Sequence, residues 1–146
     1  MTARSLEKGE AALAAIRKET GRQNAGEVWE LDLTSLDYVE GFARRIETLE
    51  RLDGLIANAG VATTHFEVVE GMELSLVVNV VSTMLLAFRA LPKLKESARR
   101  FGIQPHLVVV SSNAAFASDL ENIVEQLRGD VFDGLSTEMG YKTMVQ

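Results

Sequence analysis

The sequence predicts an α/β protein whose strands run parallel. Helical and strand patterns alternate along the chain in the order helix, strand, helix, strand, helix, strand. Crossover helices between strands make the strands parallel and place helices in layers over a sheet. The Val-rich run at residues 106–111 is short and apolar, which is typical of a strand buried on both faces of a parallel sheet.

The first half of the chain contains two predicted helices and one strand. Residues 5–20 show apolar positions near one face of a helix and are followed directly by a glycine, which favours a helix stop. Residues 27–33 alternate partly between apolar and polar side chains, as a short strand does. Thr34 or Ser35 can cap the second helix, whose apolar positions continue to Leu49.

The middle of the chain contains a second strand and a long apolar helix. Residues 52–57 form the strand, and residues 61–69 are expected to be loop. The helix extends from about residue 71 to residue 91, with a polar continuation to Arg100. Pro92 is expected to kink or interrupt it, because proline lacks the backbone N–H of a helix interior.

The apolar segment at residues 72–91 is close to membrane-spanning length. Glu73, Asn79 and Arg89 interrupt it, and charges within a membrane span are costly. We therefore expect no membrane span, but a helix buried on most sides in a soluble fold.

Beyond residue 112 the patterns weaken. We expect a short helix near residues 120–127 and an irregular tail over residues 129–146. Three strands are few for a layered sheet, since open edges expose unpaired backbone. The pattern therefore indicates a single domain over residues 1–146 that is part of a larger unit.

Composition excludes several classes of site. The 146 residues include no cysteine, which excludes disulfides and thiolate chemistry, and only two histidines, which excludes a multi-histidine metal site; we expect no metal. A net charge of −6 argues against nucleic-acid binding. The N-terminal residues show no apolar secretory core, so a cytoplasmic location is expected.

Two polar segments follow predicted strands, where ligands bind in open α/β sheets. Asp32 could accept a hydrogen bond from an adenine amino group, or could serve only as a turn or helix-capping residue. The segment Asn58-Ala59-Gly60 could let a flat ligand approach the backbone, or could simply end the strand.

Two further candidates lie in the apolar helix and after the last strand. Asn79 needs hydrogen-bond partners if it is buried, and could hold an ordered water or bond to the preceding turn. Ser112, the second of the pair Ser111-Ser112, could donate to a substrate oxygen or cap the following segment. A serine nucleophile is disfavoured, because no Gly-x-Ser-x-Gly motif surrounds it.

The order of these segments resembles the short-chain dehydrogenase/reductase family, in particular its fungal, retinol-dehydrogenase-like branch. The matching segments are Thr2-Ala3-Arg4-Ser5, Glu30-Leu31-Asp32-Leu33, Ile56-Ala57-Asn58-Ala59-Gly60, Val78-Asn79-Val80 and Val109-Val110-Ser111-Ser112. The resemblance implies a Rossmann-type doubly wound parallel sheet that binds a dinucleotide, with hydride transfer between nicotinamide and a carbonyl or secondary alcohol.

The resemblance also implies a role for each matching residue. Arg4 would pair with the 2′-phosphate of NADP, and Ser112 would donate a hydrogen bond to a small-molecule carbonyl or alcohol substrate. Asn79 would support a water in the proton relay. The residues that would contact the adenine and ribose are Asp32, Leu33, Asn58, Ala59 and Gly60. The apolar helix over residues 72–91 would form a homo-oligomer interface.

Two motifs of the family do not occur in this sequence. The Thr-Gly-x-x-x-Gly-x-Gly turn that seats the pyrophosphate is missing, and neither Tyr38 nor Tyr141 is followed by lysine four residues later. We therefore expect a partial Rossmann-type sheet that lacks the first βα unit and the C-terminal part. We expect an NADP-dependent oxidoreductase that is truncated and inactive alone. The alternatives are a degenerate, non-enzymatic paralogue or fragment that pairs with an intact relative through its apolar helix, and an incomplete gene product.

Overall fold

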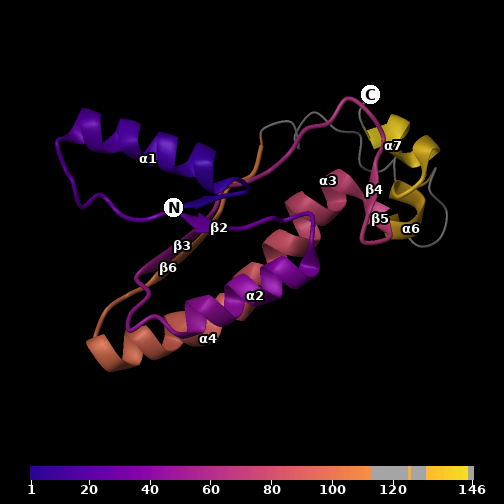
Figure 1. The fold of residues 1–146 in the computed structure, drawn as a ribbon. Helices are drawn as coiled ribbons and strands as arrows, with labels where there is room; N and C mark the ends of the chain where they lie inside the picture. Colours follow the sequence, from indigo (N-terminus) through magenta and orange to yellow (C-terminus); the bar gives the residue numbers. More distant parts are fainter. Residues whose placement is uncertain (113–124, 126–130, 145–146) are drawn as a thin grey trace.

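The computed structural model describes residues 1–112, 125 and 131–144 (Figure 1). The strands are β1 (Thr2–Ala3), β2 (Trp29–Glu30), β3 (Gly54–Ala57), β4 (Val68–Val69), β5 (Met72–Glu73) and β6 (His106–Val109). The helices are α1 (Leu6–Thr20), α2 (Leu36–Glu47), α3 (Leu74–Leu76), the π-helical segment η1 (Val77–Ser82), α4 (Thr83–Phe101), α6 (Val131–Leu135) and α7 (Glu138–Met144).

The first helix begins and ends as the sequence predicts. The Ser5 hydroxyl oxygen accepts a hydrogen bond from the Lys8 backbone N–H at 3.4 Å, which caps α1. Gly21 ends the helix in the left-handed region with φ of +69°, a conformation that glycine adopts without steric cost. The predicted strands around residues 27–33 and 52–57 are present, but shorter than expected.

The parallel pairing is confirmed, but the described strands form separate pairs. β1 pairs with β2, with Thr2 opposite Trp29, and β3 pairs with β6, with Gly54 opposite His106. Both pairs are parallel. Among the described residues, no strand joins β1 to β3 by hydrogen bonds. The layer formed by α2 and α4 therefore sets the position of one strand pair relative to the other (Figure 1).

The main core lies where α2 packs on α4 and on the ends of β2 and β3. Its buried side chains are Leu31, Val39, Phe42, Ala43, Ile46, Leu86 and Ala90. Trp29 packs edge-on against Phe42 with ring centroids 5.6 Å apart, and the Arg45 guanidinium lies 3.8 Å from the Trp29 ring centroid.

The structure corrects three sequence predictions about the second half. All residues of β6 are exposed, so burial on both faces is wrong; β3 is the only strand of the described residues that pairs with β6. Pro92 lies inside α4 and does not interrupt it. Proline leaves the Phe88 carbonyl without its helical N–H partner, but Phe88 and Pro92 are both solvent-exposed, so water can bind that carbonyl. The tail is not irregular, since it contains α6 and α7.

A hairpin replaces part of the predicted loop and delays the start of the long helix. β4 and β5 pair antiparallel around Glu70 and Gly71, whose φ angles of +50° and +78° match the tight two-residue turn that suits a hairpin. The helix consequently starts at Leu74, where the buried Glu73 carboxylate accepts hydrogen bonds from the backbone N–H groups of Ser75 and Leu76. Except for residue 125, which is helical, the helix expected near 120–127 lies outside the described residues.

The continuous helix over Leu74–Phe101 is long and apolar enough to cross a membrane by length and composition, and 44% of its most apolar window is buried within the protein. Its inner side chains Val77, Leu86 and Ala90 are buried, and α4 packs against α2. These contacts are those of a core helix in a layered α/β fold.

Gly9 of α1 packs closely against Val28 and Ala3, and this contact can be tested by its effect on stability. A Cβ atom added at Gly9 would lie 2.5 Å from Val28 Cγ1 and 2.9 Å from Ala3 Cβ. We expect Gly9→Ala to lower the free energy of unfolding by roughly 1–3 kcal/mol, because a packed contact must open. Urea denaturation followed by far-UV circular dichroism measures this change.

The matched control is Gly41→Ala in α2, where the nearest atom to the new Cβ, the Arg44 Nη2, is 3.8 Å away. This substitution should raise stability by about 0.5–1 kcal/mol through helix propensity alone. Equal effects of the two substitutions would contradict the proposed packing of α1.

Candidate functional site

The carboxyl ends of three strands converge on one cavity of about 210 Å³. Arg4 follows β1, Asp32 lies two residues after β2, and Ala59 and Gly60 follow β3. The lining residues are Thr2, Ala3, Arg4, Leu31, Asp32, Leu33, Thr34, Ala59, Gly60, Val61 and Val78. Parallel strands bring their carboxyl ends to the same edge, which is the usual ligand position in such sheets.

The structure brings together most of the predicted cofactor-binding residues. Arg4, Asp32, Leu33, Ala59 and Gly60 line the same cavity. The remaining predicted residue, Asn58, instead lines a smaller neighbouring cavity of about 60 Å³.

Asp32 has the turn role that the sequence offered as one of two alternatives. Its Oδ1 accepts hydrogen bonds from the Thr34 backbone N–H at 2.9 Å and from the Thr34 hydroxyl at 2.7 Å. This local turn fixes the carboxylate beside the cavity. No hydrogen bond from the described residues reaches Oδ2, so that oxygen can accept a bond from a ligand.

Asn79 lies on the π-helical segment η1 and is exposed, although the sequence predicted a helix buried on most sides at this position. Its Oδ1 accepts a hydrogen bond from the Val61 backbone N–H at 2.8 Å, and its Nδ2 donates to the Val61 carbonyl at 2.9 Å. The partner is thus the loop after β3 and not the preceding helical turn. Because an added Cβ at Gly60 would lie 3.0 Å from Asn79 Oδ1, the loop approaches the amide closely.

Ser82 also positions the site, and the sequence analysis missed it. Its buried hydroxyl donates to the Leu33 carbonyl at 2.7 Å, which ties the long helix to the chain after β2. The hydroxyl of the next residue, Thr83, donates to the Val78 carbonyl at 2.8 Å, across the five-residue spacing of a π-helix. A hydroxyl in an apolar helix was the available signal, but sequence alone does not identify its distant carbonyl partner.

Ser112 is exposed and is the last described residue before the gap at 113–124. It follows β6, and Val109 of β6 lies opposite Ala57 of β3. Ser112 therefore lies at the same end of its strand pair as Asn58, although it does not line the 210 Å³ cavity.

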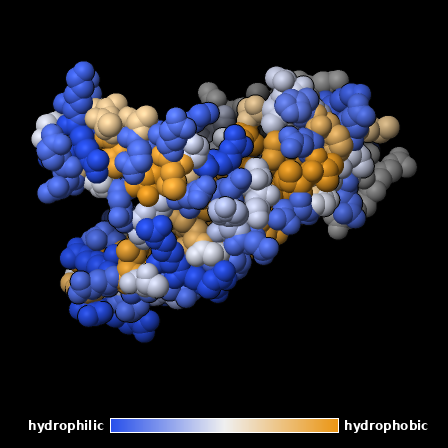
Figure 2. Space-filling view, in the orientation of Figure 1, coloured by the Kyte–Doolittle hydropathy of each residue, from blue (hydrophilic) through white to orange (hydrophobic). Residues whose placement is uncertain are grey.

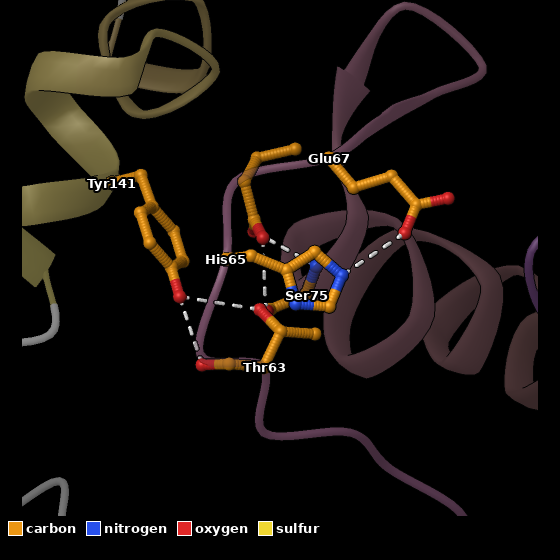
Figure 3. Close-up of polar contacts among 6 residues, drawn as sticks. Thr63, His65, Glu67, Ser75 and Tyr141 are labelled. Atoms are coloured by element: carbon orange, nitrogen blue, oxygen red, sulfur yellow. Dashed lines mark hydrogen bonds and ion pairs between the residues drawn. The ribbon is translucent and has the colours of Figure 1, made fainter.

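Tyr141 packs over the loop that follows β3 (Figure 3). Its side chain is 6% exposed, and its hydroxyl donates to the Thr63 carbonyl at 2.8 Å. The Thr63 hydroxyl donates in turn to the Tyr141 oxygen at 3.4 Å. The ring lies 6.0 Å from that of Phe66. Tyr141 thus acts here as a packing residue whose proton is held by a backbone carbonyl.

Lys142 does not lie beside the Tyr141 hydroxyl. It is exposed and donates to Glu138 Oε1 at 2.9 Å, one turn earlier on α7. This hydrogen bond and the positive charge of Lys142 lower the pKa of the Glu138 carboxyl. The ammonium group is therefore occupied on the solvent side of the helix, as expected for adjacent helical residues that point in different directions.

The geometry agrees with comparisons to known proteins. A family model described as short chain dehydrogenase matches residues 1–124. The chain belongs to the short-chain dehydrogenase family. Short chain dehydrogenase FGM9 of Gibberella zeae is 40% identical over 133 residues, which are 87% of this chain and 39% of the relative. Short chain dehydrogenase atnD of Emericella nidulans is 36% identical over 137 residues, which are 92% of this chain and 43% of the relative.

A solved short-chain dehydrogenase from Sphingobium yanoikuyae, in complex with NADPH, has a similar fold with a TM-score of 0.65 and 25% identity. The match covers 92% of this chain and 48% of that chain. The prediction of a partial Rossmann-type sheet is confirmed. The chain spans about 40% of the length of the two fungal relatives.

The Asn79 contacts predict that this side chain fixes the edge of the cavity. Asn79→Ala should speed hydrogen exchange of the Val61 amide about 5- to 10-fold, because a net hydrogen bond contributes about 1 kcal/mol. Hydrogen exchange followed by NMR measures this rate. Val80→Ala, on the neighbouring exposed position of η1, should leave it unchanged. An unchanged exchange rate of the Val61 amide in Asn79→Ala would show that Asn79 does not hold this loop in place.

Proposed function

We propose that this chain binds the adenosine 2′-phosphate end of NADP, as part of an oxidoreductase of the short-chain dehydrogenase family. The observation that carries the proposal is the convergence of Arg4, Asp32, Leu33 and Gly60 on one cavity. This set combines a cation, an acceptor, an apolar wall and close backbone access, which together suit a phosphorylated adenosine.

The cavity fits one end of the dinucleotide rather than all of it. Its volume of about 210 Å³ is below the roughly 300–1,000 Å³ of pockets for drug-sized ligands. Leu33 and Val78 provide apolar contact for a flat base, and Asp32 Oδ2 can accept from the adenine amino group. The pyrophosphate has no glycine-rich turn in this sequence to receive it.

Arg4 favours NADP over NAD. It lies at the cavity directly after β1, and its planar guanidinium can donate two hydrogen bonds to a phosphate. NAD would leave this charge without a partner. The solved bacterial relative in complex with NADPH supports the same choice.

For the whole protein we propose hydride transfer between nicotinamide and a small-molecule carbonyl or alcohol. The bound cofactor supplies the hydride chemistry. Ser112 would donate a hydrogen bond to the substrate oxygen, and Asn79 would hold the loop after β3 in place. We further propose that residues 1–146 alone do not turn over substrate, because Tyr141 and Lys142 are occupied elsewhere.

A second candidate function is self-association through the long helix. Val80 and Phe88, which are 40% and 67% exposed, lie on one side of the helix at a spacing of eight residues, with the half-buried Met84 between them. This apolar side could pair with the same helix of a second copy or of an intact relative. We also propose that the protein is cytoplasmic.

The substitution Arg4→Ala tests the preference for NADP over NAD in a binding experiment that requires no catalysis. We expect the affinity for 2′,5′-ADP to fall about 10- to 100-fold, as loss of a charge-assisted bidentate contact does, and the affinity for 5′-AMP to change little. Isothermal titration calorimetry of the full chain measures both. Arg22→Ala, in the exposed loop after α1, is the matched control and should leave both affinities unchanged. Equal losses for both nucleotides in Arg4→Ala would refute the 2′-phosphate contact.

The chain alone should give no NADPH oxidation with a panel of aldehydes and ketones, followed at the nicotinamide absorbance. General acid–base help contributes roughly 10²–10⁴-fold, and the Tyr141 proton is directed at the Thr63 carbonyl. Turnover that vanishes in Tyr141→Phe but persists in Tyr38→Phe would show that Tyr141 performs proton transfer after all.

A further inference from the structure

The turn of the β4–β5 hairpin carries a charged side chain that the cofactor proposal does not use. On the face shown in Figure 2, hydrophobic residues gather over the part of the molecule that contains the hairpin and α3. The strands of the hairpin include Val68, Val69 and Met72. Glu70 at the turn instead carries an exposed carboxylate, and this carboxylate reaches a neighbouring helix.

The backbone conformation of Glu70 is unfavourable for its residue type. Its φ of +50° makes it the only described residue other than glycine with a positive φ. Glycine, asparagine and aspartate adopt this region at lower steric cost, and Asn-Gly or Asp-Gly is the preferred pair for a two-residue hairpin turn. The stability of the turn alone therefore does not account for a glutamate here. Strained backbone of this kind persists where other contacts compensate for it.

The compensating contact is a cap on α2. Glu70 Oε1 accepts a hydrogen bond at 3.0 Å from the backbone N–H of Leu36, the first residue of α2. The first N–H groups of a helix have no partner within the helix, and the helix dipole favours a negative charge at this end. The hairpin lies at the end of the α2–α4 layer where α2 begins (Figure 1).

The residues that the sequence predicts as caps of α2 do not provide this hydrogen bond. Ser35 occupies the N-cap position, but its side chain forms no capping hydrogen bond. The Thr34 hydroxyl donates instead to Asp32 Oδ1. A carboxylate 34 residues away in the sequence thus replaces the local cap.

The cap fixes the end of the turn that lines the cofactor cavity. Residues 32–34 line that cavity, and α2 begins two residues later at Leu36. The Leu33 carbonyl accepts the hydrogen bond from the Ser82 hydroxyl, so the long helix holds the middle of the turn. Glu70 holds its end. Loss of either contact would let the turn move relative to the rest of the cavity.

We propose that Glu70 is a positioning residue for nucleotide binding, because its carboxylate caps α2 and keeps the Asp32 turn in the geometry that faces the adenosine. This role rests on the proposed function, since Glu70 does not itself line the cavity. β5 continues directly into α3, so the hairpin links the start of the long helix to the start of α2. Glutamate supplies the reach that this contact needs, whereas asparagine is one methylene shorter and glycine has no side chain.

The discriminating substitution is Glu70→Asn, because Asn-Gly improves the turn while the shorter side chain does not reach Leu36. In the full chain without nucleotide, we expect the Leu36 and Thr34 amides to exchange about 5- to 10-fold faster, as loss of one hydrogen bond does. The Leu74 amide, which donates to the Glu67 carbonyl at the base of the hairpin, should exchange no faster. Hydrogen exchange followed by NMR measures these rates. An unchanged rate at Thr34, or an equal increase at Leu74, would overturn the proposal.

Two further variants serve as matched controls. Glu70→Gln keeps an acceptor oxygen at the same reach and should restore the exchange rates of Leu36 and Thr34 to those of the unchanged chain. Ser35→Ala should also leave these rates unchanged, because the Ser35 side chain does not form the cap. Failure of glutamine to restore the rates, or the same acceleration in Ser35→Ala, would overturn the proposal.

Nucleotide affinity connects the turn to the cofactor site. In Glu70→Asn the affinities for 2′,5′-ADP and 5′-AMP should fall alike, by about 3- to 10-fold, because the turn faces the adenosine that both share. Arg4→Ala, in contrast, should weaken only 2′,5′-ADP. Unchanged affinities for both nucleotides in Glu70→Asn would overturn the proposal. If the unchanged chain binds neither nucleotide, the proposed function is wrong, and the rates at Leu36 and Thr34 alone decide whether Glu70 positions the turn.

Discussion

The packing of α2 on α4 is the constraint on which the rest of the described structure depends. Among the residues that the structure describes, no hydrogen bond joins β1–β2 to β3–β6, so the helical layer, not a continuous sheet, sets the distance between them. Val39, Ala43 and Ala90 are fully buried in this contact, and small side chains allow the helices to lie close together. Within the described residues, the arrangement of the strand pairs therefore depends on one helix pair and its apolar face.

Polar side chains on the long helix extend this constraint to the candidate site. Ser82 holds the carbonyl of Leu33 after β2, and Asn79 holds Val61 after β3. Both belong to η1, where the wider π-helical turn changes the direction of successive side chains. The same short segment therefore fixes both walls of the cavity that contains Asp32. This explains why a cavity persists between strand pairs that do not bond to each other.

The sequence predicted the fold class and most of the cavity, because both follow from local pattern and from strand order. Asp32 was expected at the carboxyl end of a strand from the pattern, and Arg4 was expected beside the same ligand only from the family resemblance; the structure places both at one cavity. The exposure of β6 could not be predicted, since an apolar run indicates only that a side chain favours burial, not that a neighbour is present to bury it. The hairpin at residues 68–73 was missed because Glu-Gly is a weak turn signal beside Asn-Gly or Asp-Gly.

Contacts between residues far apart in the chain could not be predicted, because local sequence patterns do not identify distant partners. The Tyr141 hydroxyl bonds to Thr63, 78 residues away, and the Ser136 hydroxyl oxygen accepts from the backbone N–H of Glu73, 63 residues away. Neither α6 nor α7 is long enough to show a clear period, so their stability comes from this packing rather than from propensity.

The smaller cavity of about 60 Å³ and the cofactor cavity are linked by the strands that border both. Thr2 lines both, and the chain passes from Ile56 of β3 at the smaller cavity to Gly60 at the cofactor cavity. The cavity proposed for the adenosine end takes Arg4 and Asp32 from the first strand pair and Gly60 from the second. Binding of the nucleotide fragment would therefore already depend on the contacts of Ser82 and Asn79, because these contacts hold the two walls of that cavity in place.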